Sequence, residues 1–282
     1  DDPEGLLRDA VIALHEAKSH GRDGEAFADP RLAAEAGRRL PLTRAIRDGL
    51  ARGEFVAWFQ PIVTLPGGVL SGYEALARWV GPDGAVAAPA DFLPVAEATG
   101  LVVDLDLSVI GQAAQALSRL PSPLTVAVNA SAATLAHPDY PARVLDCLTS
   151  RGVSPARLHL EVTETTLLTV SDTVVSAITR LADAGVCWYV DDFGTGYSSV
   201  SHLRDLPIAG LKLDRTFTAD LTSSGRTRQL ADALAAMARS LAMDTVAEGV
   251  ETQQQADILN AQGWQHAQGW QFGRPTPLTT TK

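Results

Sequence analysis

Residues 55–79 read FVAWFQPIVTLPGGVLSGYEALARW and contain two apolar segments separated by a short turn. The segments 55–63 and 69–79 are rich in aromatic and β-branched residues, which favour strands. Only Thr64-Leu65-Pro66-Gly67-Gly68 joins them. Because a parallel pair needs a connection of about a dozen residues or more, we expect these two strands to be antiparallel.

The rest of the chain alternates between strand and helix patterns. Further strands are expected at 124–130, 158–162, 186–191, 210–214, 244–248 and 266–272. Helices are expected at 91–98, 103–119, 140–151, 171–184, 198–205, 226–241 and 252–262, the last of them opened by a Thr252–Gln255 capping box. Such alternation is typical of a mostly parallel sheet with helices outside it. The predicted fold class is α/β, a TIM-like (β/α)8 barrel whose first strand runs antiparallel to the rest.

Two helical stretches precede the barrel. Residues 4–20 place apolar side chains on one stripe, which predicts an amphipathic helix. Residues 31–53 also read as helical, and we expect Pro41 to divide that stretch in two.

Most of the expected strands end in a residue that can bind metal or phosphate. Carboxylates are rarely buried without a partner, and a parallel barrel brings the ends of its strands to one mouth. We therefore expect one site to gather these strand-end residues: Glu74, Asn129, Glu161, Asp191, Asp192, Lys212, Glu248 and Gln268.

The segment DDFGTGYSS, residues 191–199, is the centre of this pattern. Two adjacent Asp can act at one site only where a strand ends and turns, and Gly194 and Gly196 permit such a turn. A helix cap with a tight loop is the alternative, but the other strand-end acids favour a metal site. An oxygen-rich set suits Mg²⁺ or Mn²⁺, so His159 is not expected to be a ligand.

Lys212 lies in an otherwise apolar strand, and two orientations are open for it. It could point outward between helices. The alternation with Leu211 and Leu213 instead favours an inward Lys212, whose charge the acids would stabilise. Glu164 and Glu251 each follow a strand end, where an acid is expected to cap the next helix rather than to bind metal.

Composition limits the classes of function. The chain has 282 residues, is 46% hydrophobic and carries a formal net charge of −10, which argues against a DNA or RNA partner. No apolar run is long enough to span a membrane and no signal peptide is visible, so no membrane contact is expected within this chain. The two cysteines, Cys147 and Cys187, suggest a cytoplasmic protein. The chain does not begin with Met, so we expect it to be part of a longer protein whose missing segments could anchor it to a membrane.

Several segments in one order resemble the EAL-domain family of bacterial cyclic di-GMP phosphodiesterases. They are GYEALARW at 72–79, FLPVAE at 92–97, VNAS at 128–131, EVTE at 161–164, DDFGTGYSS at 191–199, LKLDR at 211–215, VAEGVET at 246–252 and QGW at 268–270. The resemblance implies a TIM-like barrel with a reversed first strand, two Mg²⁺ or Mn²⁺ ions in each active site, and a homodimer.

The resemblance also implies roles for single residues. One cation would be held by Glu74, Asn129, Glu161 and Asp191, and a second by Asp191, Asp192 and Glu248. The catalytic residues would be Lys212, Glu248 and Asp191. Substrate-binding residues would be Arg78, Leu76, Gln60, Asp214 and Gln268. The residues that support the DDFG loop would be Glu164, Glu251, Gly194 and Thr195.

Residues 1–30 resemble a different family, since this stretch is similar to the C-terminal tail of a GGDEF diguanylate cyclase domain. The expected organisation is a short GGDEF-like remnant and linker at 1–30, followed by a phosphodiesterase domain at 31–282. The parent protein would then be a GGDEF–EAL tandem.

The expected function is hydrolysis of cyclic di-GMP to linear pGpG by two-metal, in-line attack of an activated water. The alternative is a catalytically silent receptor for cyclic di-GMP. A metal-dependent barrel enzyme of the enolase type is less favoured, because that chemistry calls for neither adjacent aspartates nor a phosphate-positioning arginine.

Overall fold

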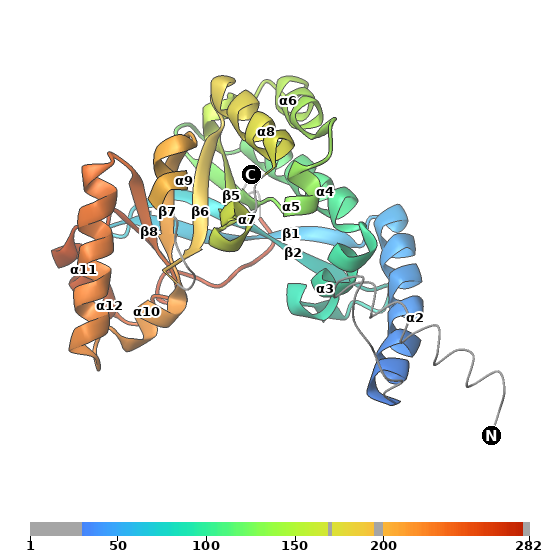
Figure 1. Ribbon diagram of the computed structural model, residues 1–282, viewed down its shortest axis with the longest axis horizontal. Coiled ribbons are helices and arrows are strands. Elements are labelled where there is room, and N and C mark those ends of the chain that lie inside the picture. Colours follow the sequence, from blue (N-terminus) through green and yellow to red (C-terminus); the bar gives the residue numbers. More distant parts are fainter. Residues whose placement is uncertain (1–29, 169–170, 195–199, 279–282) are drawn as a thin grey trace.

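The computed structural model describes residues 30–168, 171–194 and 200–278 (Figure 1). The helix expected over 4–20 and residues 1–29 of the GGDEF-like stretch lie outside these residues. No described helix has both the length and the apolar character needed to cross a bilayer.

Eight strands form a closed ring. They are β1 (Phe55–Thr64), β2 (Leu70–Val80), β4 (Thr125–Asn129), β5 (Leu158–Thr163), β6 (Cys187–Phe193), β7 (Ile208–Leu213), β8 (Asp244–Ala247) and β9 (His266–Gln268). The strands from β2 through β9 pair in parallel around the ring, whereas β1 closes it by pairing antiparallel with both β2 and β9. The TIM-like barrel with a reversed first strand is therefore confirmed.

Helices cover the outside of the ring (Figure 1). They are α2 (Pro30–Arg52), α3 (Pro89–Thr99), α4 (Val102–Leu117), α5 (Ala132–Leu135), α6 (Tyr140–Thr149), α7 (Glu164–Leu168), α8 (Asp172–Asp183), α9 (Val200–Asp205), α10 (Arg215–Asp220), α11 (Gly225–Ser240) and α12 (Gln253–Gln262), with a 3₁₀ turn at Pro155–Arg157. The predicted capping box is present, because Thr252 Oγ1 accepts from Gln255 N–H and Gln255 Oε1 accepts from Thr252 N–H.

Two expectations about single elements were wrong. Pro41 does not divide the N-terminal helix, since α2 continues through it. The position is exposed, so water can satisfy the carbonyl that loses its N–H partner.

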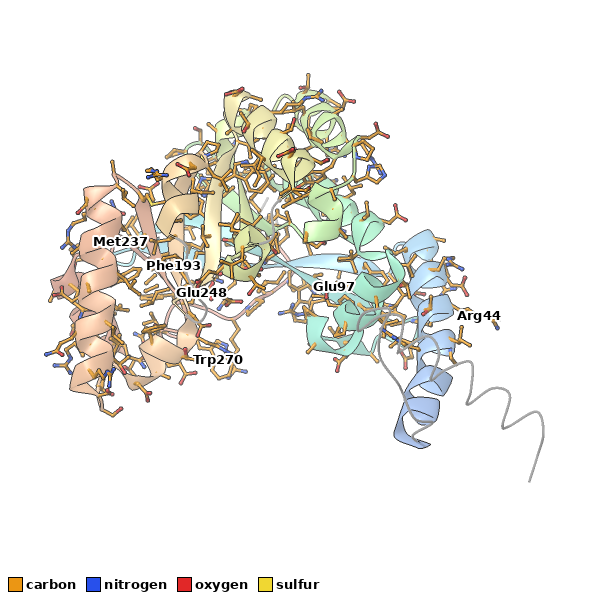
Figure 2. All side chains as sticks on the ribbon, viewed as in Figure 1. Arg44, Glu97, Phe193, Met237, Glu248 and Trp270 are labelled. Carbon is orange, nitrogen blue, oxygen red and sulfur yellow. The ribbon has the colours of Figure 1, made fainter. Side chains whose placement is uncertain are left out.

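The last strand ends at Gln268 rather than at residue 272, because the chain turns at Gly269 against the Val250 backbone, and Trp270 is exposed (Figure 2). A short strand that was not expected, β3 (Val86–Ala87), extends β2 as a hairpin.

Alternation along β6 separates two environments. Trp188 points outward, where its indole N–H donates to the Ile178 carbonyl of α8. Tyr189 points inward, stacks on His159 at a centroid distance of 4.8 Å and donates its hydroxyl to Asp244 Oδ2. The ring of Tyr189 lies over Gly210, where an added Cβ would come within 2.4 Å of it. We call Tyr189, His159, Gly210 and Asp244 the barrel floor, because they lie together at the end of the ring opposite the acid-bearing strand ends.

Candidate active site

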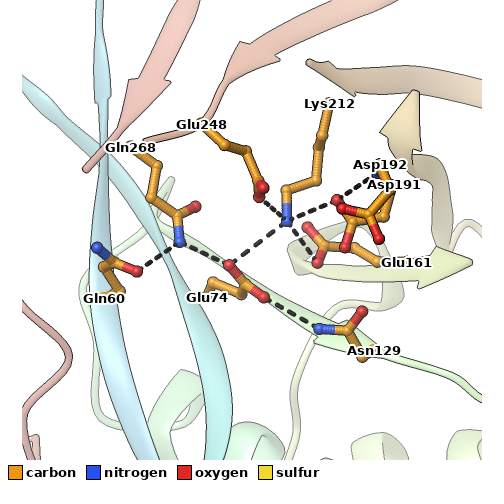
Figure 3. A network of polar contacts seen from close by, with 9 residues as sticks. All are labelled: Gln60, Glu74, Asn129, Glu161, Asp191, Asp192, Lys212, Glu248 and Gln268. Carbon is orange, nitrogen blue, oxygen red and sulfur yellow. Dashed lines mark hydrogen bonds and ion pairs between the residues drawn. The ribbon is translucent and has the colours of Figure 1, made fainter. Parts of the chain in front are cut away.

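Lys212 lies at the centre of the barrel mouth, on β7 (Figure 3). Its side chain is fully buried. The ammonium Nζ lies 2.6 Å from Glu248 and 2.8 Å from Glu161. It lies 3.4 Å from Glu74 and from Asp191. Four carboxylates from different strands or strand ends therefore surround one ammonium. Of the two orientations that the sequence left open for Lys212, the structure shows the inward one.

The charges in this cluster do not balance. Glu74, Glu161, Asp191, Asp192 and Glu248 share the field of one ammonium, so their like charges disfavour full ionisation. Burial raises the pKa of Glu161 well above its usual range, and it raises the pKa of Glu248 to about 8 despite the opposing effect of Lys212. Burial, with Asp191 and Asp214 nearby, raises the pKa of Asp192 to about 6.

The pKa of Lys212 is also raised, but for an amine a raised pKa favours the charged form. Burial disfavours its charge, but the carboxylates of Asp191, Glu161, Glu248 and Glu74 outweigh burial and raise its pKa. Lys212 is therefore a permanent cation within the cluster, and it neutralises only part of the negative charge there.

Amide side chains extend the cluster along one wall of the barrel. Glu74 Oε1 accepts from Asn129 Nδ2 at 3.0 Å, and Glu74 Oε2 accepts from Gln268 Nε2 at 2.6 Å. Gln268 Nε2 also donates to Gln60 Oε1 at 2.9 Å. The Oε1 atom of Gln268 is buried and has no hydrogen-bond partner among the described residues. The network thus links strands β1, β2, β4 and β9 (Figure 3).

The DDFG segment turns at the end of β6 as expected. Asp192 has a φ of 53°, an unusual value for a residue other than glycine, and its N–H donates to Asp191 Oδ1. Gly194 has a φ of 96°, and its N–H donates to Glu164 Oε2 at 3.0 Å. The turn lets both carboxylates face the mouth. Thr195, expected to support this loop, lies outside the described residues.

The turn is also packed tightly against a helix. A Cβ added at Gly194 would lie 2.9 Å from the ring of Phe217 on α10. Gly194 therefore combines a left-handed backbone conformation with a close contact, and both require glycine.

The chemistry of the acids fits a divalent cation. Asp191, Asp192 and Glu248 each offer an oxygen, and these oxygens lie within 4.8 Å of one another. Lys212 Nζ shows where positive charge is already accommodated between Glu74, Glu161 and the DDFG acids. An all-oxygen set of this kind suits Mg²⁺ or Mn²⁺ better than zinc.

Some predicted residues lie at the edge of the site or away from its acids. Asp214 caps α10 by accepting from Thr216 N–H at 2.9 Å. Arg78 and Leu76 share the inward face of β2 with Glu74. The Glu251 residue is exposed, and no hydrogen bond or ion pair of its carboxylate is found within the described part of the chain.

Asp106 was not expected and supports the site from behind. It is a buried carboxyl on α4 that accepts from Ser131 N–H at 3.0 Å and from Thr134 Oγ1 at 2.7 Å. It thereby fixes the turn that follows Asn129. The sequence signal was available, because an acid at 106 interrupts the apolar stripe formed by Val102, Leu105 and Val109.

Comparison with protein families gives one match that covers most of the chain. The EAL domain family matches residues 43–275. The cyclic di-GMP phosphodiesterase NbdA of Pseudomonas aeruginosa is 38% identical over 279 residues, which are 98% of this chain and 36% of the relative. The chain spans 33% to 40% of the length of four of the curated relatives that it matches.

Solved structures give the same picture. A structure described as PaMucR phosphodiesterase in complex with c-di-GMP has a TM-score of 0.79 and 37% identity, covering 84% of this chain and 98% of the other. The manganese and cyclic di-GMP complex of Klebsiella pneumoniae BlrP1 has a TM-score of 0.71 and 30% identity, covering 79% of this chain and 56% of the other.

Proposed function

The chain belongs to the EAL-domain family, and from this premise we propose that it is a metal-dependent phosphodiesterase that opens cyclic di-GMP to linear pGpG. One observation carries the proposal: four carboxylates surround the buried ammonium of Lys212 at the ends of the barrel strands, an arrangement that suits a cation site. The name of NbdA as a cyclic di-GMP phosphodiesterase and the c-di-GMP ligand of the PaMucR structure support this substrate.

Two Mg²⁺ or Mn²⁺ ions would be held by the acids of the cluster. Glu74, Asn129, Glu161 and Asp191 would hold the first, and Asp191, Asp192 and Glu248 the second. When bound, such cations lower the pKa of water and neutralise charge on a phosphate. The hydrogen bond from Asn129 Nδ2 to Glu74 leaves the carbonyl oxygen of Asn129 free to serve as a ligand.

The protein's own groups move the proton and hold the phosphate. Glu248, whose carboxylate lies 2.6 Å from Lys212 Nζ, would in its ionised form accept the proton of the attacking water. Lys212 remains charged and would orient the attacking water and offset the charge that develops on phosphorus oxygens. Arg78, Gln60 and Gln268 would position the substrate, and the unpartnered Oε1 of Gln268 is available to accept from it.

The remaining assignments are part of the same proposal. The phosphodiesterase domain occupies 31–282, and residues 1–30 are the remnant of a GGDEF-like domain from a tandem protein. Glu164, Glu251, Gly194 and Thr195 hold the DDFG loop, Leu76 and Asp214 contact the substrate, and the domain forms a homodimer. Both cysteines are free thiols, which suits a cytoplasmic setting.

A product assay tests the proposal. Purified protein, cyclic di-GMP and Mg²⁺ or Mn²⁺ are incubated, and pGpG is measured by chromatography. The wild-type protein is expected to form pGpG, and EDTA is expected to abolish it. Glu248→Gln and Lys212→Met should each lower kcat by at least about a hundredfold, the usual contribution of a proton acceptor or of one group that stabilises charge.

Glu97→Gln is the matched control, because it removes an exposed carboxylate on the outer helix α3, well apart from Glu248 (Figure 2), and should retain full activity. Circular dichroism establishes that each variant is folded. Calorimetry completes the test: binding of cyclic di-GMP by the wild type without product would favour a receptor and reject the enzyme. Full activity of both site variants would reject the assigned roles.

A further inference from the structure

Trp58 and Arg78 form a contact that the sequence did not predict. The guanidinium carbon of Arg78 lies 5.5 Å from the ring centroid of Trp58, within the range of a cation–π interaction. The register pairs Trp58 with Leu76, so Arg78 is the diagonal neighbour of Trp58 on the β1–β2 ladder. Two adjacent strands therefore supply the cation and the aromatic ring.

Both side chains lie on the face of the ladder that carries the acid cluster. Trp58 alternates with buried Phe59 and shares its face of β1 with Gln60, which bonds to Gln268. Arg78 shares its face of β2 with Glu74. The Trp58–Arg78 pair thus continues the wall of the site from the acids toward the rim of the barrel.

Arg78 has few other partners. Its Nη1 donates to the Ala77 carbonyl at 2.7 Å, and within residues 30–168, 171–194 and 200–278 it forms no ion pair with a carboxylate. A guanidinium has five N–H donors. Most of its donors therefore remain open, although the group itself is held by the indole face and by one backbone carbonyl.

This arrangement is suited to a phosphate. An arginine already paired with an acid would have to break that pair before it bound an anion, whereas an aromatic face restrains the guanidinium without using its N–H donors. A restrained guanidinium also loses less conformational entropy when it binds, which raises affinity.

We propose that Trp58 is a positioning residue that holds Arg78 ready to bind a phosphate of the cyclic dinucleotide. The proposal rests on the proposed function, because it takes Arg78 as a substrate contact. Trp58 acts on substrate binding through Arg78 and does not take part in the chemical step.

The test compares KM with kcat. Trp58→Leu removes the ring and is expected to raise KM for cyclic di-GMP roughly fivefold, with kcat within about twofold of the wild-type value. Trp58→Phe keeps an aromatic face and should raise KM less. Binding of Mn²⁺, followed by electron paramagnetic resonance, should be unchanged in both variants.

Trp79→Phe is the matched control. Trp79 is the next tryptophan along the chain, but it stacks on Phe55 and donates to Glu54 on the other face of β2. Its replacement tests a general loss of packing near the same ladder. KM is expected to stay at the wild-type value in this variant.

A double-mutant cycle tests whether Trp58 acts through Arg78. In an Arg78→Ala background, Trp58→Leu should raise KM no further. An equal increase in both backgrounds, or an unchanged KM in Trp58→Leu alone, would overturn the proposal. If the wild-type protein forms no pGpG, the proposed function fails instead, and the two failures are therefore distinguishable.

Discussion

Lys212 is the cation that the carboxyl groups at the barrel mouth share. One ammonium cannot neutralise five carboxyl groups, so some of them hold protons when no metal is bound. Glu248 and Asp192 are the groups whose raised pKa values, about 8 and about 6, lie in the accessible range. The acids are therefore arranged for a ligand that brings additional positive charge.

Metal binding should become stronger as pH rises. A bound cation requires ionised ligands, so it must displace at least the proton of Glu248, and affinity should fall by at least about tenfold for each unit of pH below 8. Mn²⁺ titrations by calorimetry at pH 6, 7 and 8 measure this, and buffers of different ionisation enthalpy count the released protons. Glu97→Gln serves as the control. Equal affinity at pH 6 and 8 would contradict the expectation.

The same pKa has a consequence for the metal-free fold. Because the pKa of Glu248 is raised from 4.5 to about 8, the folded protein binds more protons than the unfolded chain between these values. The free energy of unfolding of the metal-free protein should therefore fall as pH rises through this window.

At the residue scale the sequence predicted which side chains meet, because the parallel strands of a barrel all end at the same mouth. We expected four acids to meet Lys212, and the structure places each of them within ion-pair distance of its ammonium. They are Glu74, Glu161, Asp191 and Glu248. Their roles in catalysis remain predictions.

Trp58 and Asp106 could not be assigned in the same way. A tryptophan in an apolar strand reads as core, and only the three-dimensional neighbour, Arg78, shows otherwise. The interrupted apolar stripe marks Asp106 as a buried acid, but its partners lie 25 and 28 positions away in the sequence, so no local pattern links it to the site.

At the scale of elements, β6 and β7 must fit together at the barrel floor. The sequence marked Tyr189 only as a bulky residue in a strand. The structure shows that its ring occupies the space that a side chain at position 210 would need. Tyr189 and Gly210 are thus complementary positions on neighbouring strands.

Gly210→Ala should therefore destabilise the barrel. The new Cβ would lie 2.4 Å from Tyr189, and overpacking of this kind costs about 1–3 kcal/mol of unfolding free energy. Urea denaturation measures the loss. In a Tyr189→Ala background the same change should cost much less, since the ring is gone.

Gly225→Ala is the control for this prediction. No atom lies within 4 Å of a Cβ added at Gly225, which begins α11, so its replacement should leave stability unchanged or slightly higher. Additive effects of Gly210→Ala and Tyr189→Ala would show that the two positions are independent, contrary to the structure.

Strands and long helices were predicted to within a few residues, because their periodicity extends over many positions. Shorter elements were missed. The helices α5, α7 and α10 and strand β3 have two to six residues each, too few for a periodic pattern. Three of them, α5, α7 and α10, directly follow strands that carry site residues, so the missed elements shape the mouth of the barrel.

At the scale of the whole molecule, the site unites strands from most of the ring. Glu74 lies on β2, Glu161 on β5, Asp191 on β6 and Lys212 on β7. A cation bound among them would connect distant parts of the chain, and unfolding would have to release it.

Divalent cations should therefore stabilise the whole fold. At a free concentration of about a hundred times Kd, Mn²⁺ should raise the free energy of unfolding by about 2.7 kcal/mol. Urea denaturation with and without Mn²⁺ measures the change, with NaCl at equal ionic strength as a control. Asp191→Asn should reduce the gain, because Asp191 is proposed to serve both ions. An equal midpoint with and without Mn²⁺ would contradict the metal assignment.

The reversed strand β1 joins the two halves of the ring through residues that are far apart in the sequence. Ile62 pairs with Gln268, and Gln60 receives a hydrogen bond from Gln268 across 208 positions. During synthesis on a ribosome, the first strand to emerge must wait for the last before the circle can shut. The acid cluster at the mouth is therefore completed only after residue 268 has left the ribosome, and a nascent chain that stops before this point lacks the amide wall that Gln268 gives to Glu74.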